Sequence, residues 1–322
     1  MTDASSSATP SLFCFGLGYT AIALARLVLP LGWKVAGTTT DPDKLAALKA
    51  AGIAAELFSI DRPLIDARAS LGGATHILVS IPPCGEGDPA FDVHSEDIAG
   101  APNLKWLGYL STTGVYGNRD GEWIDESATP APTSRRGDHR LRAEEEWSGL
   151  HYHTNVPLHI FRLSGIYGPG RSALDSLRAG HARRIDKPGH VFNRIHVEDI
   201  AATLLASMQK PNPGAIYNLA DDEPASSADV LSHGSKLIGM DEPPLIDIDK
   251  ADLAPMVRSF YKDNKRIRND RIKDELGVVL KYPDYRVGLA ACLLAEDAEY
   301  DDPRDAALAA LMLAGTSGGA GR

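Results

Sequence analysis

Short apolar runs alternate with helix-like segments through the first half of the chain. An apolar run at 12–15 precedes a helical pattern at 19–31, and a run at 34–40 precedes a helical pattern at 42–51. Further apolar runs follow at 55–60, 76–81, 104–111 and 158–163. This alternation is typical of parallel strands joined by crossover helices. The sequence therefore predicts an α/β fold, with a doubly wound parallel sheet covered by helices on both faces.

Small residues follow the first apolar run, in the stretch FCFGLGYTA at 13–21. Gly16 permits a tight turn, Gly18 lets the backbone approach a pyrophosphate, and Ala21 lets the helix pack close to the strand. A pyrophosphate there would lie on free N–H groups at a helix N-terminus. We therefore expect a nicotinamide dinucleotide to bind this turn. The alternative is an ordinary strand–helix turn with incidental glycines.

The end of the second apolar run bears on the choice between NAD and NADP. NAD-selective folds usually place an acidic residue there, which binds the ribose 2′-hydroxyl. Here the positions are Thr38, Thr39 and Thr40, and Asp41 comes one or two positions later than that role requires. Hydroxyl groups can bind a 2′-phosphate without repelling it, and Lys44 lies nearby. We expect NADP, with NAD as the alternative; the threonines are also consistent with a plain strand end.

The charge and the cysteine content limit the classes of partner. The net charge of −10 argues against nucleic acid or an anionic membrane as the main partner, but not against a phosphorylated small ligand. No apolar run reaches the roughly 18 residues that a membrane span needs. The 3 cysteines are far apart, which fits a reducing compartment and offers no metal site. We expect a cytoplasmic protein that binds neither nucleic acid, membrane nor metal.

A second motif, STTGVYG at 111–117, resembles the S-[ST]-x-x-V-Y-G segment of the extended short-chain dehydrogenase/reductases, a group that includes nucleotide-sugar epimerases and dehydratases. Three further stretches resemble segments of that family, in the same order: RLSGIYGPGR at 162–171, NRIHVEDIA at 193–201 and IYNLADDEP at 216–224. NKRIRNDRIKDELG at 264–277 resembles the closing segment of an atypical branch, known mostly as NAD-dependent epimerase/dehydratase-like. The resemblance covers roughly residues 11–290.

The resemblance implies a Rossmann-type domain followed by a smaller C-terminal substrate domain. We divide the chain into a disordered N-terminus at 1–10, a dinucleotide-binding core at 11–165, a mostly substrate-binding lobe at 166–302 with segments that return to the core, and a tail at 303–322 that begins with a short helix. We expect another helix to begin near Leu141. The resemblance also implies a homodimer formed through that helix.

The resemblance assigns roles to individual residues. Thr112 falls on the catalytic Ser/Thr position, where its hydroxyl would bind the substrate oxygen; it is also consistent with a residue that merely ends a strand. We expect further cofactor contacts at Asp61, Ser80 and Tyr167. Arg171, Arg194 and His196 are expected to shape the substrate site, although a packed core histidine is an alternative for His196.

The departure from the family lies at its Tyr-x-x-x-Lys acid/base pair. Aligning Glu144 with the glutamate that follows this lysine places Arg140 at the lysine and Arg136 at the tyrosine. Arg140 can still donate to a ribose hydroxyl. Arg136 cannot shuttle a proton, because a guanidinium keeps its protons in proteins. It can instead bind a substrate phosphate or carboxylate in bidentate fashion.

If hydride transfer occurs, another group must move the proton. Tyr116, Asp138 and His139 are nearby candidates, and no spacing singles one of them out. We therefore expect an NAD(P)-dependent oxidoreductase, epimerase or dehydratase-like enzyme with an atypical site, acting on a sugar-like or nucleotide-sugar substrate. The alternative is a catalytically silent NADP(H)-binding sensor or scaffold. The loss of tyrosine favours the sensor, whereas the retained Thr112, Arg140 and substrate lobe favour the enzyme.

Overall fold

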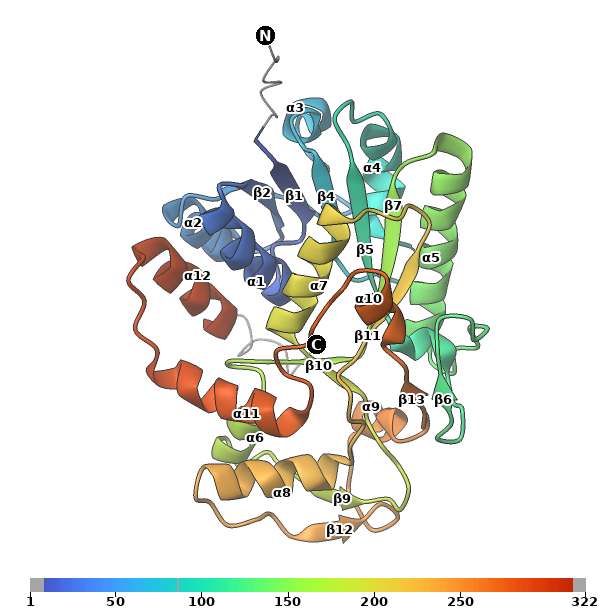
Figure 1. Cartoon of the computed structure of the whole chain (residues 1–322), viewed down its shortest axis with the longest axis vertical. Helices are drawn as coiled ribbons and strands as arrows, with labels where there is room; N and C mark the ends of the chain where they lie inside the picture. The colour runs from blue at the N-terminus through green and yellow to red at the C-terminus, as the bar shows by residue number, and fades with distance from the viewer. Residues whose placement is uncertain (1–8, 86, 315–322) are drawn as a thin grey trace.

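A sheet of seven parallel strands forms the centre of the computed structural model, which describes residues 9–85 and 87–314 (Figure 1). The strand order is β11-β7-β5-β4-β1-β2-β3. The strands are β1 (Ser11–Phe15), β2 (Lys34–Thr39), β3 (Ala54–Leu57), β4 (His76–Val79), β5 (Trp106–Thr112), β7 (Leu158–Leu163) and β11 (Ile216–Leu219). The order reverses between β1 and β4, and ligands of open α/β sheets bind at such a switch point. The predicted Rossmann-type fold is confirmed.

Helices cover both faces of this sheet. The side chains of β1 alternate: Leu12 and Cys14 join the core under one face, and Phe13 and Phe15 join the core under the other. The first face carries α1 (Tyr19–Val28), α2 (Pro42–Ala50), α7 (Val197–Gln209) and α12 (Pro303–Ala314). The second face carries α3 (Ala67–Gly72), α4 (Pro89–Ala99) and α5 (Arg135–Thr154).

Helix α5 begins at Arg135 and not near Leu141 as expected from the sequence. The reason is Ser134, whose side-chain oxygen accepts a hydrogen bond from the Gly137 N–H at 3.2 Å and so caps the helix. Arg136 therefore lies in the first turn of the helix, and Arg140 lies one turn later on the same side. The short helix that we expected at the start of the tail is α12. Most of the predicted disordered N-terminus and the end of the predicted tail, at 1–8 and 315–322, lie outside the described residues.

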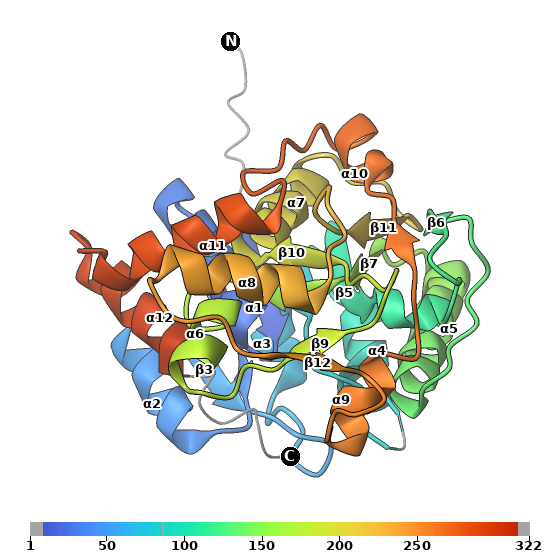
Figure 2. The same ribbon diagram turned by 90° about the horizontal axis from the view of Figure 1, so that it is seen from below.

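A smaller lobe lies beyond the carboxyl ends of the sheet strands (Figures 1 and 2). Its helices are α6 (Ala173–Arg178), α8 (Ser227–Leu237), α9 (Pro255–Phe260) and α11 (Tyr285–Leu294), and its paired strands are β8 (Gly165–Tyr167) with β10 (Arg194–His196), and β9 (Arg184–Asp186) with β12 (Leu245–Asp247). β6 (Trp123–Ile124) pairs with β13 (Arg266–Ile267), which leads into α10 (Asp270–Asp274). Single turns of 3₁₀ helix lie at Leu29–Leu31, Thr113–Tyr116 and Ala295–Asp297.

No helix in the described part of the chain combines the length and the apolar character needed to cross a membrane. Within 9–85 and 87–314, no group of three or more His, Cys, Asp or Glu side chains is arranged to hold a metal ion.

A buried ion pair ties α5 to the sheet. Glu144 on α5 and Arg162 on β7 are only 4% and 3% exposed, and an Nη2–Oε2 distance of 2.6 Å joins them. Ser111 on β5 donates its hydroxyl to the same carboxylate, and the Arg162 guanidinium lies 4.8 Å from the ring centroid of Tyr116. Because each charge has a charged partner and the carboxylate also accepts from Ser111, the network avoids much of the cost of a lone buried charge, although Arg162 Nη1 has no hydrogen-bond partner among the described residues.

Among the buried histidines of the described residues, His76, His159, His190 and His196 share a shifted pKa. Burial lowers the pKa of each to about 4, since the charged ring would lose its water. The neutral form also suits the contacts of His159, whose Nε2 accepts the Asn212 N–H at 2.8 Å. The ring of His159 takes up a proton near pH 6.5 in the unfolded chain, but only near pH 4 in the folded chain.

We therefore expect the free energy of unfolding to fall as the pH is lowered from 6.5 to 4, because the unfolded state then binds more protons than the native state. A single histidine shifted in this way contributes about 2 kcal/mol of the loss between pH 7 and pH 5. In His159→Gln, urea unfolding at the two pH values should show a loss smaller by that amount. Replacing the exposed His153 by Gln is the control. An unchanged loss in His159→Gln would contradict the prediction.

Candidate functional site

A cleft of about 1990 Å³ separates the carboxyl edge of the sheet from the small lobe. Gly18, Ser80 and Thr112, which follow or end the neighbouring strands β1, β4 and β5, line its sheet side. Residues of the lobe, among them Tyr167 and Arg171, line the opposite side. The cleft therefore lies at the switch point where α/β sheets bind their ligands.

Gly16 holds a tight turn that favours glycine. Its φ is +90°, which favours glycine, and an added Cβ would lie 3.0 Å from Ile81 Cγ1 and 3.2 Å from Ser80 Oγ. The Gly16 N–H donates to Thr38 Oγ1 at 2.9 Å, and Ser80 Oγ donates to the Gly16 carbonyl at 2.6 Å. Thr38 and Ser80 thus fix the turn from the two strands that flank β1.

Gly18 opens the same turn to the cleft. It is the N-cap of α1, where no side chain accepts a hydrogen bond from the first turn of the helix. A Cβ added at Gly18 would meet no atom within 4 Å. Ala21, in contrast, is fully buried beneath the helix. The N-terminus of α1 therefore faces the cleft with its first N–H groups uncovered by side chains.

The residues expected to decide the preference between NAD and NADP differ in burial and in their hydrogen bonds. Thr38 is buried and its hydroxyl accepts from Gly16, whereas Thr39 Oγ1 accepts from the Asp41 N–H at 3.2 Å. Thr40 is exposed. Asp41 caps α2 by accepting from the Asp43 and Lys44 N–H groups. Sequence reasoning missed this bond between Thr38 and the glycine turn, because strand register decides which threonine points inward.

Asp61 lies in an exposed turn after β3, where Ser59 and Arg62 bridge the chain. It is not among the residues that line the cleft, so the structure does not bring it together with Gly18 and Ser80.

Thr112, Arg136 and Arg140 line the same cleft. Thr112 Oγ1 accepts the Gly114 N–H at 3.1 Å, which leaves the hydroxyl proton for another acceptor. Arg140 Nη1 donates to the Leu110 carbonyl and, at 3.3 Å, to the Tyr109 hydroxyl. Arg136 is exposed and forms no hydrogen bond or ion pair with any residue in the described part of the chain. Its five N–H donors are therefore available to an anionic ligand.

The three residues considered as proton carriers differ in access to the cleft. Tyr116 is fully buried and donates to Asn218 Oδ1 at 2.8 Å, and burial raises the pKa of its phenol. Asp138 is exposed on α5 and does not line the cleft. His139 does line it, and its Nε2 accepts from Arg135 Nε at 3.4 Å.

Two of the residues expected to contact substrate, Arg171 and Arg194, lie in the cleft, whereas His196 does not. Arg171 and Arg194 line the cleft: Arg171 lies 5.7 Å from the Tyr19 ring centroid, and Arg194 Nη1 donates to the Phe192 and Ala225 carbonyls. Burial lowers the pKa of Arg194.

Tyr167 also lines the cleft, and its hydroxyl donates to the Asp284 carbonyl at 3.5 Å. His196 lies behind Tyr167, with its ring centroid 5.2 Å from that of Tyr167 and 3.8 Å from that of Tyr282. The structure therefore does not bring His196 into the cleft.

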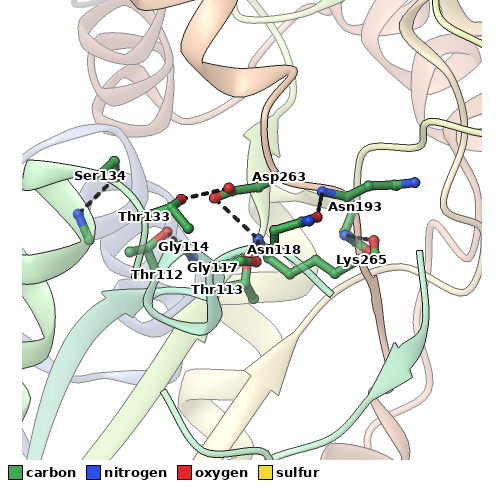
Figure 3. Close-up of polar contacts among 12 residues, drawn as sticks. Thr112, Thr113, Gly114, Gly117, Asn118, Thr133, Ser134, Asn193, Asp263 and Lys265 are labelled. Carbon is green, nitrogen blue, oxygen red and sulfur yellow. Dashed lines mark hydrogen bonds and ion pairs between the residues drawn. The ribbon is translucent and has the colours of Figure 1, made fainter. Parts of the chain in front are cut away.

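A polar cluster that sequence reasoning missed lies beside the loop that follows Thr112 (Figure 3). Thr133 Oγ1 donates to Asp263 Oδ1 at 2.6 Å, and Lys265 Nζ donates to the Gly117 carbonyl at 2.7 Å. Asn193 Nδ2 donates to the Lys265 carbonyl at 3.0 Å. Lys265 stands in the segment 264–277, whose resemblance gave it no role, and the contact spans 148 residues of sequence. No local pattern signals a contact of that kind.

The cleft is cationic although the whole chain has a net charge of −10. Its described lining includes seven basic residues and three acidic ones. The basic residues are Arg135, Arg136, Arg140, Arg171, Arg183, Arg194 and Lys265, and the acidic residues are Asp175, Asp252 and Asp263. Such a cleft attracts anions.

Comparisons with known proteins place the chain among proteins of this fold. No protein-family model matches it. It is 28% identical over 281 residues to protein YeeZ of Escherichia coli K12, covering 84% of this chain and 95% of YeeZ. A UDP-glucuronic acid 4-epimerase from Bacillus cereus, solved in complex with UDP-glucuronic acid and NAD, has a TM-score of 0.70 at 17% identity, covering 87% of this chain and 97% of the epimerase. At that identity the likeness shows a shared fold.

The solved structure of a functionally unknown conserved protein from Silicibacter pomeroyi DSS is much more similar. It has a TM-score of 0.82 and 50% sequence identity, over 89% of this chain and 99% of that chain. Because half of the residues are identical over nearly the whole length of both proteins, the chain belongs to the same family as this Silicibacter pomeroyi protein.

Proposed function

We propose that the chain is an NAD(P)-dependent oxidoreductase, epimerase or dehydratase-like enzyme that acts on a sugar-like or nucleotide-sugar substrate. The turn at Gly16 and Gly18 carries this proposal, because it leaves the N-terminus of α1 uncapped by side chains and open to the cleft. Helix N-termini of this kind bind phosphate groups through their N–H groups and the helix dipole. The fold shared with an epimerase solved with NAD supports the same proposal.

The residues present fit a nicotinamide dinucleotide. The pyrophosphate would lie at Gly18, where the absence of a side chain leaves open space. Arg140 uses Nη1 for its two protein contacts, so Nε and Nη2 remain for a ribose hydroxyl. Ser80 and Tyr167 line the cleft on either side. When bound, the dinucleotide supplies hydride transfer, and the protein supplies its orientation.

We infer a preference for NADP over NAD. The last residues of β2 and the residue after it present no carboxylate for a ribose 2′-hydroxyl, and the first carboxylate, that of Asp41, is engaged in capping α2. Thr40 is exposed, and Lys44 lies in the first turn of α2. These two side chains offer a hydroxyl and a cation to a 2′-phosphate.

The proposed substrate carries an anionic group. Arg136 lies in the cleft with no protein partner among the described residues, and Arg171 lines the lobe side. A guanidinium fork suits phosphate or carboxylate. Thr112, at the end of β5, has a free hydroxyl proton for the substrate oxygen. This combination supports a phosphorylated sugar or nucleotide sugar.

A catalytically silent NADP(H) sensor is the second candidate. The observation that favours it is Arg136, which occupies the position aligned with the family's tyrosine and cannot exchange a proton. The lobe and the open Thr112 hydroxyl favour the enzyme, because a sensor needs neither of them.

A cytoplasmic location and a homodimer remain part of the proposal. Cys14, Cys84 and Cys292 are all free thiols, as expected in a reducing compartment. The exposed residues of α5 include Arg142, Glu145 and Tyr152, so a dimer interface formed by this helix would be largely polar.

Gly18→Val tests the cofactor site. A valine Cβ fits the protein at this position but fills the space that the pyrophosphate needs, so affinity should fall by more than about tenfold, or 1.4 kcal/mol. Fluorescence titrations with NADPH and NADH measure the affinity and also test the preference for NADP. The control is Gly73→Val, at an exposed glycine away from the cleft with equally open surroundings. Unchanged binding in a folded Gly18→Val protein would refute the assignment, and tighter NADH binding in wild type would refute the preference.

Thr112→Val separates the enzyme from the sensor. It keeps the shape of the side chain but removes the hydroxyl, which accepts the Gly114 N–H and would donate to the substrate oxygen. We expect kcat to fall about a hundredfold, or ~3 kcal/mol, with dinucleotide affinity unchanged. The assay is turnover on a panel of sugar nucleotides and carbonyl compounds, with Thr154→Val on the exposed end of α5 as the control. Dinucleotide binding without turnover in wild type would favour the sensor. Full turnover in Thr112→Val would exclude Thr112 as a catalytic residue.

A further inference from the structure

Lys265 is a buried amine on the wall of the proposed active-site cleft. Its side chain is only 10% exposed, and it lines the same cleft as Thr112 and Arg136. Nζ donates to the Gly117 carbonyl at 2.7 Å, at the end of the loop that begins with Thr112. Figure 3 shows the side chain extended from its own segment toward this loop. A lysine thus approaches the predicted catalytic segment from the C-terminal part of the chain.

The carboxylate beside Lys265 is held partly away from it. Asp263 Oδ2 lies 3.9 Å from Nζ, beyond hydrogen-bond distance, while Thr133 donates to Oδ1 of the same carboxylate at 2.6 Å. The ammonium form of Lys265 therefore has one close acceptor, the neutral carbonyl of Gly117. A buried ammonium with so little compensation loses much of its advantage over the neutral amine.

The surroundings of Lys265 shift its pKa in both directions, with burial as the largest cause. Burial lowers the pKa of Lys265, the nearby Arg119 guanidinium lowers it further, and only Asp263 raises it. The ring of His190 also lies within electrostatic range; burial lowers its own pKa to about 4, so it is neutral at pH 7. Burial and Arg119 therefore make the ammonium form of Lys265 less stable than that of an exposed lysine.

Three other titratable groups of the cleft, Tyr19, Tyr167 and His139, are already engaged in hydrogen bonds within the protein. The Tyr19 hydroxyl donates to the Pro169 carbonyl at 2.9 Å and that of Tyr167 to the Asp284 carbonyl, and burial raises the pKa of both phenols. His139 Nε2 already accepts from Arg135. Among the described residues that line the cleft, Lys265 is the single lysine.

We propose that Lys265 exchanges the proton of the substrate oxygen, in the role that a tyrosine at position 136 would otherwise fill. The inference rests on the proposed function. When a substrate alcohol is oxidised, its O–H bond breaks and the proton passes to neutral Nζ as an N–H bond forms, with a nicotinamide dinucleotide as the hydride acceptor. In the reverse direction the ammonium returns this proton to the carbonyl oxygen.

Lys265 also anchors the loop at Gly117, and a purely structural role has to be distinguished from proton exchange. Lys265→Arg makes this distinction, since a guanidinium can still donate to the Gly117 carbonyl but does not release a proton at accessible pH. Lys265→Met removes both functions at similar length. Lys187→Met is the matched control, because Lys187 also donates to a backbone carbonyl, that of Tyr261, but does not line the cleft.

The experiment combines three measurements on wild type and these variants: dinucleotide titration, the pH profile of kcat, and the pH dependence of amine labelling by acetic anhydride at Lys265 and Lys187. We expect the midpoint for labelling of Lys265 at lower pH than that of Lys187. We also expect kcat to fall 10²–10⁴-fold in both Lys265→Met and Lys265→Arg. Dinucleotide affinity should be unchanged in all variants, and the control should retain wild-type kcat.

Retention of wild-type kcat and pH profile by Lys265→Arg would overturn the inference and leave the proposed function intact. A labelling midpoint for Lys265 equal to or above that of Lys187 would also overturn it. Failure of the wild-type protein to bind any nicotinamide dinucleotide would instead overturn the proposed function, and the inference with it.

Discussion

The buried carboxylate of Glu144 fixes the position of the site. It accepts from Ser111 on β5 and forms an ion pair with Arg162 on β7, so one side chain of α5 is tied to two neighbouring strands. Thr112 follows Ser111 directly, and Arg140 lies one turn before Glu144 on the helix. The distance between the proposed catalytic hydroxyl and the basic face of α5 therefore depends on this network. Removing either Glu144 or Arg162 would leave the other charge buried and unpaired, which lowers the free energy of unfolding by roughly 3–5 kcal/mol.

Much of the sheet side of the site is predictable from the sequence, because parallel strands end at one edge. Once the alternation of strands and helices is recognised, Gly16, Ser80 and Thr112 must lie near one another, since they follow or end the neighbouring strands β1, β4 and β5. The start of α5 is less predictable. Position 134 stands in a tract rich in Pro, Ser and Thr that resembles a loop, but the Ser134 side chain caps a helix that begins six residues earlier than the sequence predicts.

The rest of the site depends on side-chain direction and on contacts between distant segments. Three consecutive threonines look equivalent in sequence, yet Thr38 points inward to Gly16 and Thr40 outward to water. His196 belongs to a motif of the resemblance, but the aromatic rings of Tyr167 and Tyr282 enclose it. Lys265 reaches Gly117 only because β13 pairs with β6 and brings two remote segments together. None of these outcomes follows from local periodicity.

The arrangement separates two tasks that a Tyr-x-x-x-Lys pair combines on one helix. In such a pair the lysine binds the ribose and also lowers the pKa of the tyrosine that exchanges the proton. With arginines at positions 136 and 140, α5 carries two permanent positive charges at any physiological pH, and neither guanidinium changes its protonation. In the proposed enzyme, proton exchange would then come from a side chain whose charged form is poorly stabilised. Burial at the wall of the cleft, with its carboxylate neighbour held 3.9 Å away, gives Lys265 that property.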